Sequence, residues 1–269
     1  MTLPPILTDK YHGAASVFAP EALLREARRQ RGLAAGDVPA VCLLDPDGDL
    51  VDHLRRSGRA RPCPAWACYH TDLDRFALGG REVGVVGRAV GAPFAVLVAE
   101  QLFASGCRTL VSLTSAGQIA PAGPPPYFVV IARALRDEGT SYHYAPSADY
   151  AEAPPALVAA AAEALRGLRQ PSRVGASWTT DAPYRETVEA IAAARARGIL
   201  AVEMEAAALY SFAAAQARDV LCLAHVTNTM AVAGDDFEKG EADGVADALA
   251  VLGAVVDALA PSALRDHAP

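Results

Sequence analysis

The sequence predicts one α/β domain with three layers, in which helices cover both faces of a mixed, mostly parallel central sheet. Short apolar runs typical of buried strands alternate with longer runs typical of helices. The 269 residues, 52% of them hydrophobic, suffice for one large core, and the proline-rich residues 121–126 are too few for a domain linker. We therefore treat residues 1–269 as a single domain, with an N-terminal extension and helix (residues 1–39) before the core (residues 40–260).

The first half of the chain contains a predicted helix, a strand, a hairpin and a second helix. Residues 20–31 begin with proline and precede a glycine, a pattern typical of helix ends. Residues 40–44 form a short apolar strand that runs into the turn sequence Asp-Pro-Asp-Gly. In residues 76–87 a Gly-Gly pair joins two apolar runs, which predicts a hairpin and makes the sheet mixed. An apolar helix follows, from residue 91 to about residue 104.

The second half alternates buried strands with helices. The predicted strands are residues 109–113, 127–132, 199–202 and 220–226, and the predicted helices are residues 155–168, 185–197, 206–215 and 244–259. Ligands of open α/β sheets bind at the carboxyl ends of the strands. We therefore expect the site where five such ends converge, namely residues 45–48, 88–93, 114–117, 203–205 and 227–230.

Composition excludes several classes of function. The net charge is −7 and no basic run occurs, so nucleic acid is not an expected partner. We find no signal-peptide pattern and no apolar run of transmembrane length, and the odd, scattered set of five cysteines favours reduced thiols in a cytoplasm. Cys63, Cys68 and His70 lack the tight spacing and the second ligand pair of a metal site, so no metal is predicted.

Two acids flank a methionine where a buried strand becomes an apolar helix. Glu203, Met204 and Glu205 follow the strand 199–202 and precede the helix 206–215. Charges in such surroundings are costly unless they are paired or hydrogen-bonded. In one interpretation a carboxylate holds the hydroxyls of a sugar while the methionine packs on its apolar face. In the other, one acid caps the helix and the other faces solvent.

This segment resembles the ribose-site signature of the nucleoside phosphorylase superfamily, which includes purine nucleoside and uridine phosphorylases. Further blocks are similar in order and spacing: residues 87–93 with the following helix, residues 105–110, and the triplet Ser115-Ala116-Gly117. Residues 139–146 look like a segment of uridine phosphorylases in particular. The resemblance extends over residues 41–259, and it implies the nucleoside phosphorylase fold.

The resemblance implies roles for the residues at the sugar. Glu205 would accept hydrogen bonds from the ribose 2′- and 3′-hydroxyls, Met204 would pack on the sugar, and Glu203 would shape the pocket. Ser115 matches a hydroxyl that faces phosphate or ribose, and Gly117 belongs to the same substrate-binding triplet.

On the base side, residues 179–185 match the segment that lines the base. The resemblance places Asp181 in this segment, lets Tyr184 stack on the base and lets Arg185 bond a base carbonyl. Asn228 stands where enzymes acting on 6-aminopurines carry an aspartate acid. An amide cannot give up a proton, but it donates a hydrogen bond to developing negative charge. Asn228 and Arg185 are thus the candidate catalytic residues, and they suit a pyrimidine or 6-oxopurine leaving group.

The sequence departs from the family at the phosphate site. Phosphorylases of this family use a glycine and an arginine in the first loop and an arginine on a later strand, but these positions are Leu44, Gly48 and Ser112. Arg88, together with Ser115, is the candidate substitute because phosphate recognition favours guanidinium donors. The Ser-Ala-Gly triplet is also similar to nucleosidases, which use water, so phosphate and water both remain open as the nucleophile.

We therefore expect a nucleoside-phosphorylase-like pentosyltransferase of nucleoside salvage. It would cleave a uridine or 6-oxopurine nucleoside to free base and ribose 1-phosphate. Inorganic phosphate would be the co-substrate, and no metal or organic cofactor would be needed. A hydrolase and a non-catalytic nucleoside sensor are the alternatives. Family members share sites across a dimer, so a homo-oligomer (a dimer or a trimer of dimers) is expected, in which His12 and His70 reach a neighbour's sugar or phosphate.

Overall fold

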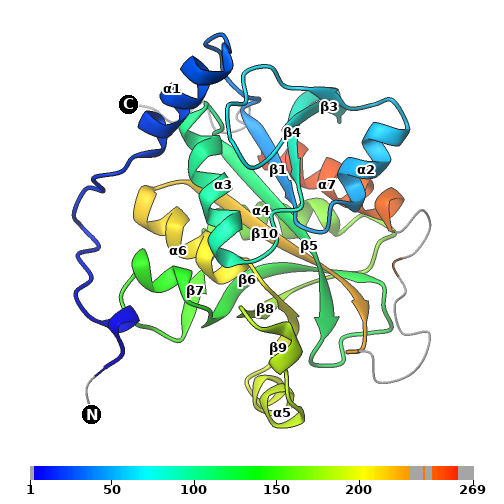
Figure 1. Cartoon of the computed structure of the whole chain (residues 1–269). Helices are drawn as coiled ribbons and strands as arrows, with labels where there is room; N and C mark the ends of the chain where they lie inside the picture. The colour runs from blue at the N-terminus through cyan, green and yellow to red at the C-terminus, as the bar shows by residue number, and fades with distance from the viewer. Residues whose placement is uncertain (1–2, 231–238, 240–243, 260–269) are drawn as a thin grey trace, which may run out of the picture.

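The computed structural model of the protein describes residues 3–230, 239 and 244–259. Within them a mixed, ten-stranded sheet lies between two layers of helices (Figure 1). The predicted α/β architecture with a mixed central sheet is confirmed. The N-terminal segment before the first long helix runs along the outside of the molecule.

The elements are as follows. The strands are β1 (Val41–Asp45), β2 (Arg61–Pro62), β3 (Asp74–Leu78), β4 (Arg81–Gly87), β5 (Thr109–Gln118), β6 (Tyr127–Asp137), β7 (Tyr150–Glu152), β8 (Ser172–Thr180), β9 (Ile199–Glu203) and β10 (Asp219–Asn228). The helices are α1 (Pro20–Arg31), α2 (Asp49–Arg56), α3 (Ala92–Ala104), α4 (Pro155–Leu165), α5 (Val188–Ala196), α6 (Ala206–Gln216) and α7 (Val245–Leu259). Short 3-10 turns are η1 (Pro5–Leu7), η2 (Thr140–His143) and η3 (Pro183–Arg185).

Strand β5 pairs with three other strands. Its first half lies parallel to β1 on one edge and to β10 on the other. Strand β5 continues past the end of β1. Its last residues, on the edge where β1 pairs with the first residues, pair with β9 instead, and Gly117 lies opposite Val202. Strands β10, β6, β8, β9 and β5 therefore close into a ring, and β1, β4, β3 and β2 extend from it as an open sheet.

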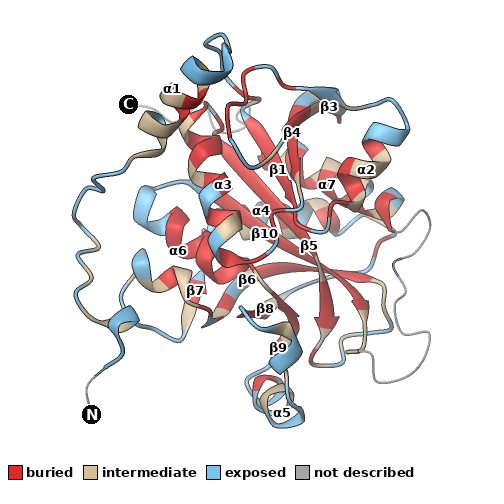
Figure 2. Cartoon of the chain, in the orientation of Figure 1, coloured by how far each residue is buried: buried red, intermediate tan, exposed pale blue. Residues whose placement is uncertain are grey.

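Helices cover the sheet on both faces, and burial follows this layering (Figure 2). Helices α3 and α6 pack over one face, whereas α2, α4 and α7 pack over the other. Helix α6 is buried all round from Ala206 to Ala213, which explains why the sequence provides it with no polar face. Helix α5 stands apart and packs through Ala194 against β8 and β9.

Some elements differ from the sequence predictions for local reasons. The turn predicted at residues 45–48 leads into helix α2, which was not predicted; the buried Asp45 carboxylate accepts a hydrogen bond from Val51 N–H at 2.9 Å in the first turn of this helix. Helix α5 starts later than predicted because Thr187 caps it by accepting a hydrogen bond from Ala190 N–H. Strand β8 was not predicted, because Ser172–Thr180 is rich in polar and small residues.

One buried hydroxyl joins the α6 layer to the sheet, and its removal is a test of the fold. Tyr210 Oη donates to Ile131 O at 2.6 Å and accepts from Cys222 N–H at 2.9 Å. Tyr210→Phe leaves that buried N–H without a partner, so we expect the free energy of unfolding to fall by about 1–3 kcal/mol. Denaturant titration measures the change. Tyr11→Phe, at an exposed tyrosine, is the control, and a loss below about 0.5 kcal/mol in Tyr210→Phe would contradict the prediction.

Candidate active site

A cleft of about 390 Å³ opens at the carboxyl ends of β1, β5, β9 and β10. This is the edge at which the sequence predicted the site. The cleft is lined by Pro46, Asp47, Val90, Thr114, Ser115, Ala116, Gly117, Pro183, Tyr184, Glu186, Val202, Glu203, Met204, Glu205, Asn228 and Met230.

Glu203 is a buried acceptor whose two oxygens are both engaged. One oxygen accepts hydrogen bonds from Ser177 Oγ at 2.9 Å and Thr179 Oγ1 at 2.5 Å. The other accepts from the backbone N–H groups of Glu205 and Ala206, each at 2.7 Å. Burial raises its pKa, and these four donors oppose the rise. Glu203 thus caps α6 and holds the turn that carries its neighbour.

Glu205 lies in the cleft with one oxygen unused. Its side chain is 2% exposed, and Oε1 accepts a hydrogen bond from Gly91 N–H at 2.7 Å. Oε2 is buried and has no hydrogen-bond partner among the described residues. Burial, and then the nearby Glu203, raise the pKa of Glu205 to about 8. A carboxyl oxygen without a partner beside Met204 is complementary to the hydroxyl donors of a sugar.

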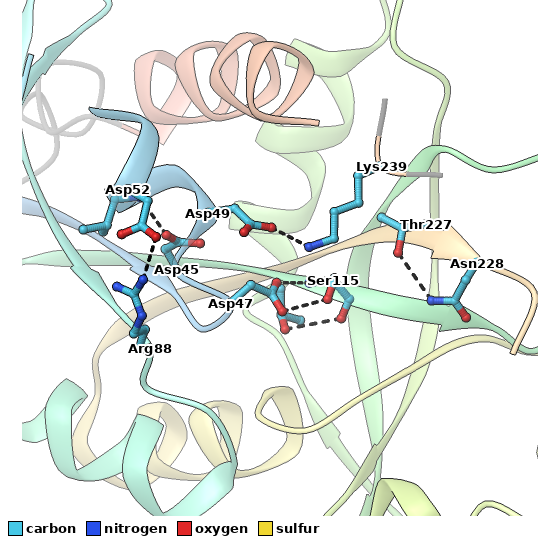
Figure 3. Close-up of polar contacts among 11 residues, drawn as sticks. Asp45, Asp47, Asp49, Asp52, Arg88, Ser115, Thr227, Asn228 and Lys239 are labelled. Atoms are coloured by element: carbon cyan, nitrogen blue, oxygen red, sulfur yellow. Dashed lines mark hydrogen bonds and ion pairs between the residues drawn. The ribbon is translucent and has the colours of Figure 1, made fainter. Parts of the chain in front are cut away.

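Ser115, which also lines the cleft, is hydrogen-bonded to a carboxylate (Figure 3). Its backbone N–H donates to Asp47 Oδ2 at 2.6 Å, and its Oγ donates to Oδ1 at 2.8 Å. Gly117, two residues further along β5, allows a close approach, because a Cβ there would overlap the sulfur of Met230. Ser115 and Gly117 therefore both line the cleft where they were predicted.

The loop after β1 is acidic, and the nearby cations are paired. Arg88 Nη2 lies 2.6 Å from Asp52 Oδ2, and Lys239 Nζ lies 2.5 Å from Asp49 Oδ2 (Figure 3). Burial, opposed in part by backbone hydrogen bonds, raises the pKa of Asp45 to about 7. Arg88, the candidate phosphate ligand, does not line the cleft. Its binding of phosphate stays a prediction.

On the base side, the cleft is lined by the predicted residues Tyr184 and Asn228 and by Glu186, which was not predicted. Tyr184 is 99% exposed at the mouth, and Asn228 accepts a hydrogen bond from Met230 N–H at 2.9 Å. Glu186 also lines the cleft, and partial burial raises its pKa to about 7. Its position directly after residues 179–185, the segment expected to line the base, was the available signal. Arg185 does not line the cleft, so its role stays a prediction.

Three further predicted residues lie outside the cleft of the single chain. Asp181 accepts a hydrogen bond from Gly139 N–H at 2.8 Å, and a ring nitrogen of His12 lies 3.1 Å from Tyr142 O. His70 is exposed. The substrate contact of Asp181 and the cross-subunit contacts of the two histidines stay predictions.

Neither a metal cluster nor a membrane span was found in the part of the chain that the structure describes. No three His, Cys, Asp or Glu side chains there are arranged to hold a metal ion. None of the described helices is both long and apolar enough to cross a bilayer.

The ring of strands, with a pair of acids at the β9–α6 turn and a cleft beside it, defines a protein of the nucleoside phosphorylase fold class. Residues 41–260 match the family model described as Phosphorylase superfamily. The match spans most of the chain, and the protein belongs to this family.

Relatives and solved structures agree with this membership. A purine nucleoside phosphorylase of the DeoD type from Jannaschia sp. is 31% identical over 182 residues, which are 63% of this chain and 75% of that protein. Uridine phosphorylase from Salmonella typhimurium is 27% identical over 201 residues, 69% of this chain and 79% of that protein. The crystal structure of uridine phosphorylase from Vibrio fischeri superposes with a TM-score of 0.68 at 20% identity, covering 81% of this chain and 90% of that one, which shows the shared fold.

The raised pKa of Glu205 predicts a dependence of stability on pH. The unfolded chain loses this proton near pH 4.5, whereas the folded protein keeps it to about pH 8, so the free energy of unfolding falls as pH rises through this window. Burial lowers the pKa of His225 to about 4, so its contribution to stability still rises until about pH 7.5, one unit above the pKa of the unfolded imidazole, but it is the same in wild type and variant. We expect the unfolding temperature to fall between pH 6.5 and 8, and less steeply in Glu205→Gln.

Thermal melts followed by circular dichroism at closely spaced pH values measure both slopes. Glu186 and Asp45 have raised pKa values in both proteins, so their contributions cancel in the comparison. An equal slope in the wild type and the variant would remove Glu205 as its source.

Because Glu203 accepts four hydrogen bonds, replacing its carboxylate with an amide should destabilise the fold. Glu203→Gln replaces one acceptor with an NH₂ group that faces backbone or hydroxyl donors, so we expect the free energy of unfolding to fall by about 1–3 kcal/mol. Chemical denaturation measures this change at pH 8. Glu152→Gln, at an exposed position, serves as the matched control. Equal stability of the two variants would show that the Glu203 network does not support the fold.

Proposed function

We propose that the protein is an enzyme that cleaves the N-glycosidic bond of a nucleoside. One observation carries the proposal: Glu205 presents a buried oxygen without a described partner beside Met204 in the cleft. Membership of the phosphorylase superfamily supports it, as do relatives named purine nucleoside phosphorylase and uridine phosphorylase.

The charges of the cleft suit this chemistry. Breaking an N-glycosidic bond builds positive charge on the sugar and negative charge on the base. Groups that bind this charge-separated state more tightly than the substrate lower the barrier. Glu205 and Asp47 both line the cleft, so the carboxylate of Asp47, joined by that of Glu205 above its pKa of about 8, places negative charge near the sugar that becomes cationic. The reaction needs no metal or organic cofactor.

The base-side residues favour a base with a ring N–H next to a carbonyl. The amide of Asn228 has N–H groups that can donate to a base carbonyl, and the carboxylate of Glu186 can accept from the neighbouring ring N–H. Uracil and 6-oxopurines both present this edge. We therefore propose a nucleoside of the uridine or 6-oxopurine type.

The nucleophile has two candidates. The names of the relatives favour phosphate, which would release ribose 1-phosphate and make the enzyme a pentosyltransferase. Water, which would release free ribose, is favoured by a specific observation: the donors of Ser115 are already bonded to Asp47. A homo-oligomer in the cytoplasm is part of the proposal by family resemblance.

The test is the release of free base from uridine, inosine and adenosine, with and without phosphate. At pH 9, above the pKa of about 8, Glu205→Gln loses the charged acceptor for the sugar hydroxyls, so we expect kcat/KM to fall about 10- to 100-fold on the best substrate, as for a lost charged hydrogen bond. Glu189→Gln, an exposed position on α5, should keep the wild-type value. An unchanged rate in Glu205→Gln would contradict the sugar-binding role, and tight nucleoside binding without turnover would indicate a sensor.

A further inference from the structure

A second cavity, larger than the cleft, lies between helix α3, the turn η2 and the N-terminal segment. Its volume is about 560 Å³, which is within the range of ~300–1,000 Å³ that is typical of small-molecule sites. Val96 and Leu97 of α3, together with Phe18 of the N-terminal segment, give this cavity apolar walls. None of the residues that line it also lines the cleft.

The N-terminal segment is tied to η2 and forms one wall of the cavity (Figure 1). A ring nitrogen of His12 lies 3.1 Å from a backbone carbonyl oxygen of η2, and Lys10 Nζ lies 3.2 Å from Nδ1 of His143. Ile6 packs closely on the same turn, because a Cβ at Gly139 would lie 3.3 Å from its Cδ1. These contacts hold the apolar side chains of the segment over α3.

Gln101 places an acceptor without a partner in the wall of this cavity. The residue is 2% exposed, and its amide nitrogen donates to Leu97 O at 3.2 Å, one turn earlier on α3. Its Oε1 is buried and has no hydrogen-bond partner among the described residues. A buried oxygen without a partner is rare and costly, because burial removes the hydrogen bonds that water would donate. A ligand with an N–H group would satisfy this oxygen.

The lining contains two carboxylates and, among the described residues, neither lysine nor arginine. Glu100, next to Gln101 on α3, accepts a hydrogen bond from Tyr144 Oη at 2.9 Å, and Asp181 accepts one from Gly139 N–H at 2.8 Å. Carboxylates favour a positive charge on a ligand, whereas the walls favour apolar groups. An ammonium group on an apolar body is complementary to both.

Two short segments of the chain connect this cavity to the cleft. Pro93 lines the cavity, and two residues earlier Gly91 N–H donates to Glu205 at 2.7 Å. Asp181 lines the cavity, and two residues later Pro183 lines the cleft. A ligand that shifts either segment also moves a group that lines or supports the cleft.

We propose that this cavity binds a small amphipathic amine, whose ammonium group lies at Glu100 and Gln101 and whose apolar body lies between α3 and the N-terminal segment. The bound amine changes the affinity of the cleft for nucleoside through the segments at Gly91 and Pro183. This coupling rests on the proposed cleavage of nucleosides, whereas the binding of the amine does not.

Titration calorimetry of the full chain with 2-phenylethylamine tests the site. We expect saturable binding with a Kd below about 1 mM. The uncharged alcohol 2-phenylethanol has the same apolar body and should bind at least about tenfold more weakly, because it lacks the charge that faces the carboxylates. The anion 3-phenylpropionate should not bind. Equal affinity for all three compounds, or no saturable binding of the amine, would overturn the proposal.

Variants locate the amine. Glu100→Gln removes the charge but keeps an acceptor for the Tyr144 hydroxyl, and Gln101→Leu removes the unpartnered oxygen at similar volume. We expect each to weaken amine binding about tenfold. Glu152→Gln, at an exposed acid outside the cavity, is the matched control and should bind the amine like the wild type.

The acidic cleft is the alternative place for an amine, and Asp47→Asn tests it. We expect this variant to bind 2-phenylethylamine like the wild type. A loss of binding in Asp47→Asn with unchanged binding in Glu100→Gln would place the amine in the cleft and overturn the proposal. If Gln101→Leu fails to fold, Glu100→Gln and the three compounds on the wild type decide.

The nucleoside-cleavage assay tests the coupling. At a concentration of 2-phenylethylamine that saturates the wild type, KM for the best nucleoside should change about fivefold or more, and less in Glu100→Gln. Saturable binding with an unchanged KM would overturn the coupling and leave the binding site in place. A failure to cleave any nucleoside would overturn the proposed function, while calorimetry would still decide whether the cavity binds the amine.

Discussion

The buried carboxylate of Glu203 holds together the three segments that form the sugar side of the cleft. Its oxygens join β8, through Ser177 and Thr179, to the first backbone N–H groups of α6. Helix α6 is apolar on every side, so the cap at its N-terminus cannot come from a polar face of its own. Because this network fixes the turn, one oxygen of Glu205 accepts a hydrogen bond from Gly91 N–H, and the other has no partner among the described residues. The raised pKa of Glu205 follows from the same burial.

The layered fold was predictable because most of its elements are long and apolar, but the closure of the sheet was not. Apolar periodicity indicated where β1, β5, β6, β9 and β10 begin. It missed that β5 extends to Gln118 and β6 to Asp137, because these extensions contain small and polar residues. In a ring of strands such residues face a cleft or a neighbouring strand rather than a helix layer. The same argument explains why β8 was not expected.

Site residues were predictable where a recognisable sequence motif and the turn that exposes it lie in one short segment of the chain. Met204 and Glu205 line the cleft because a strand-to-helix turn exposes consecutive residues at the sheet edge. Asp47 was part of a predicted turn, but its bond to Ser115 joins residues 68 positions apart, which spacing along the chain cannot indicate. Glu186 was not predicted, because Tyr184 and Arg185 have the side chains that were expected to stack on the base and to bond its carbonyl. The chain forms a 3-10 turn over Pro183–Arg185, and Tyr184 and Glu186 line the cleft whereas Arg185 does not.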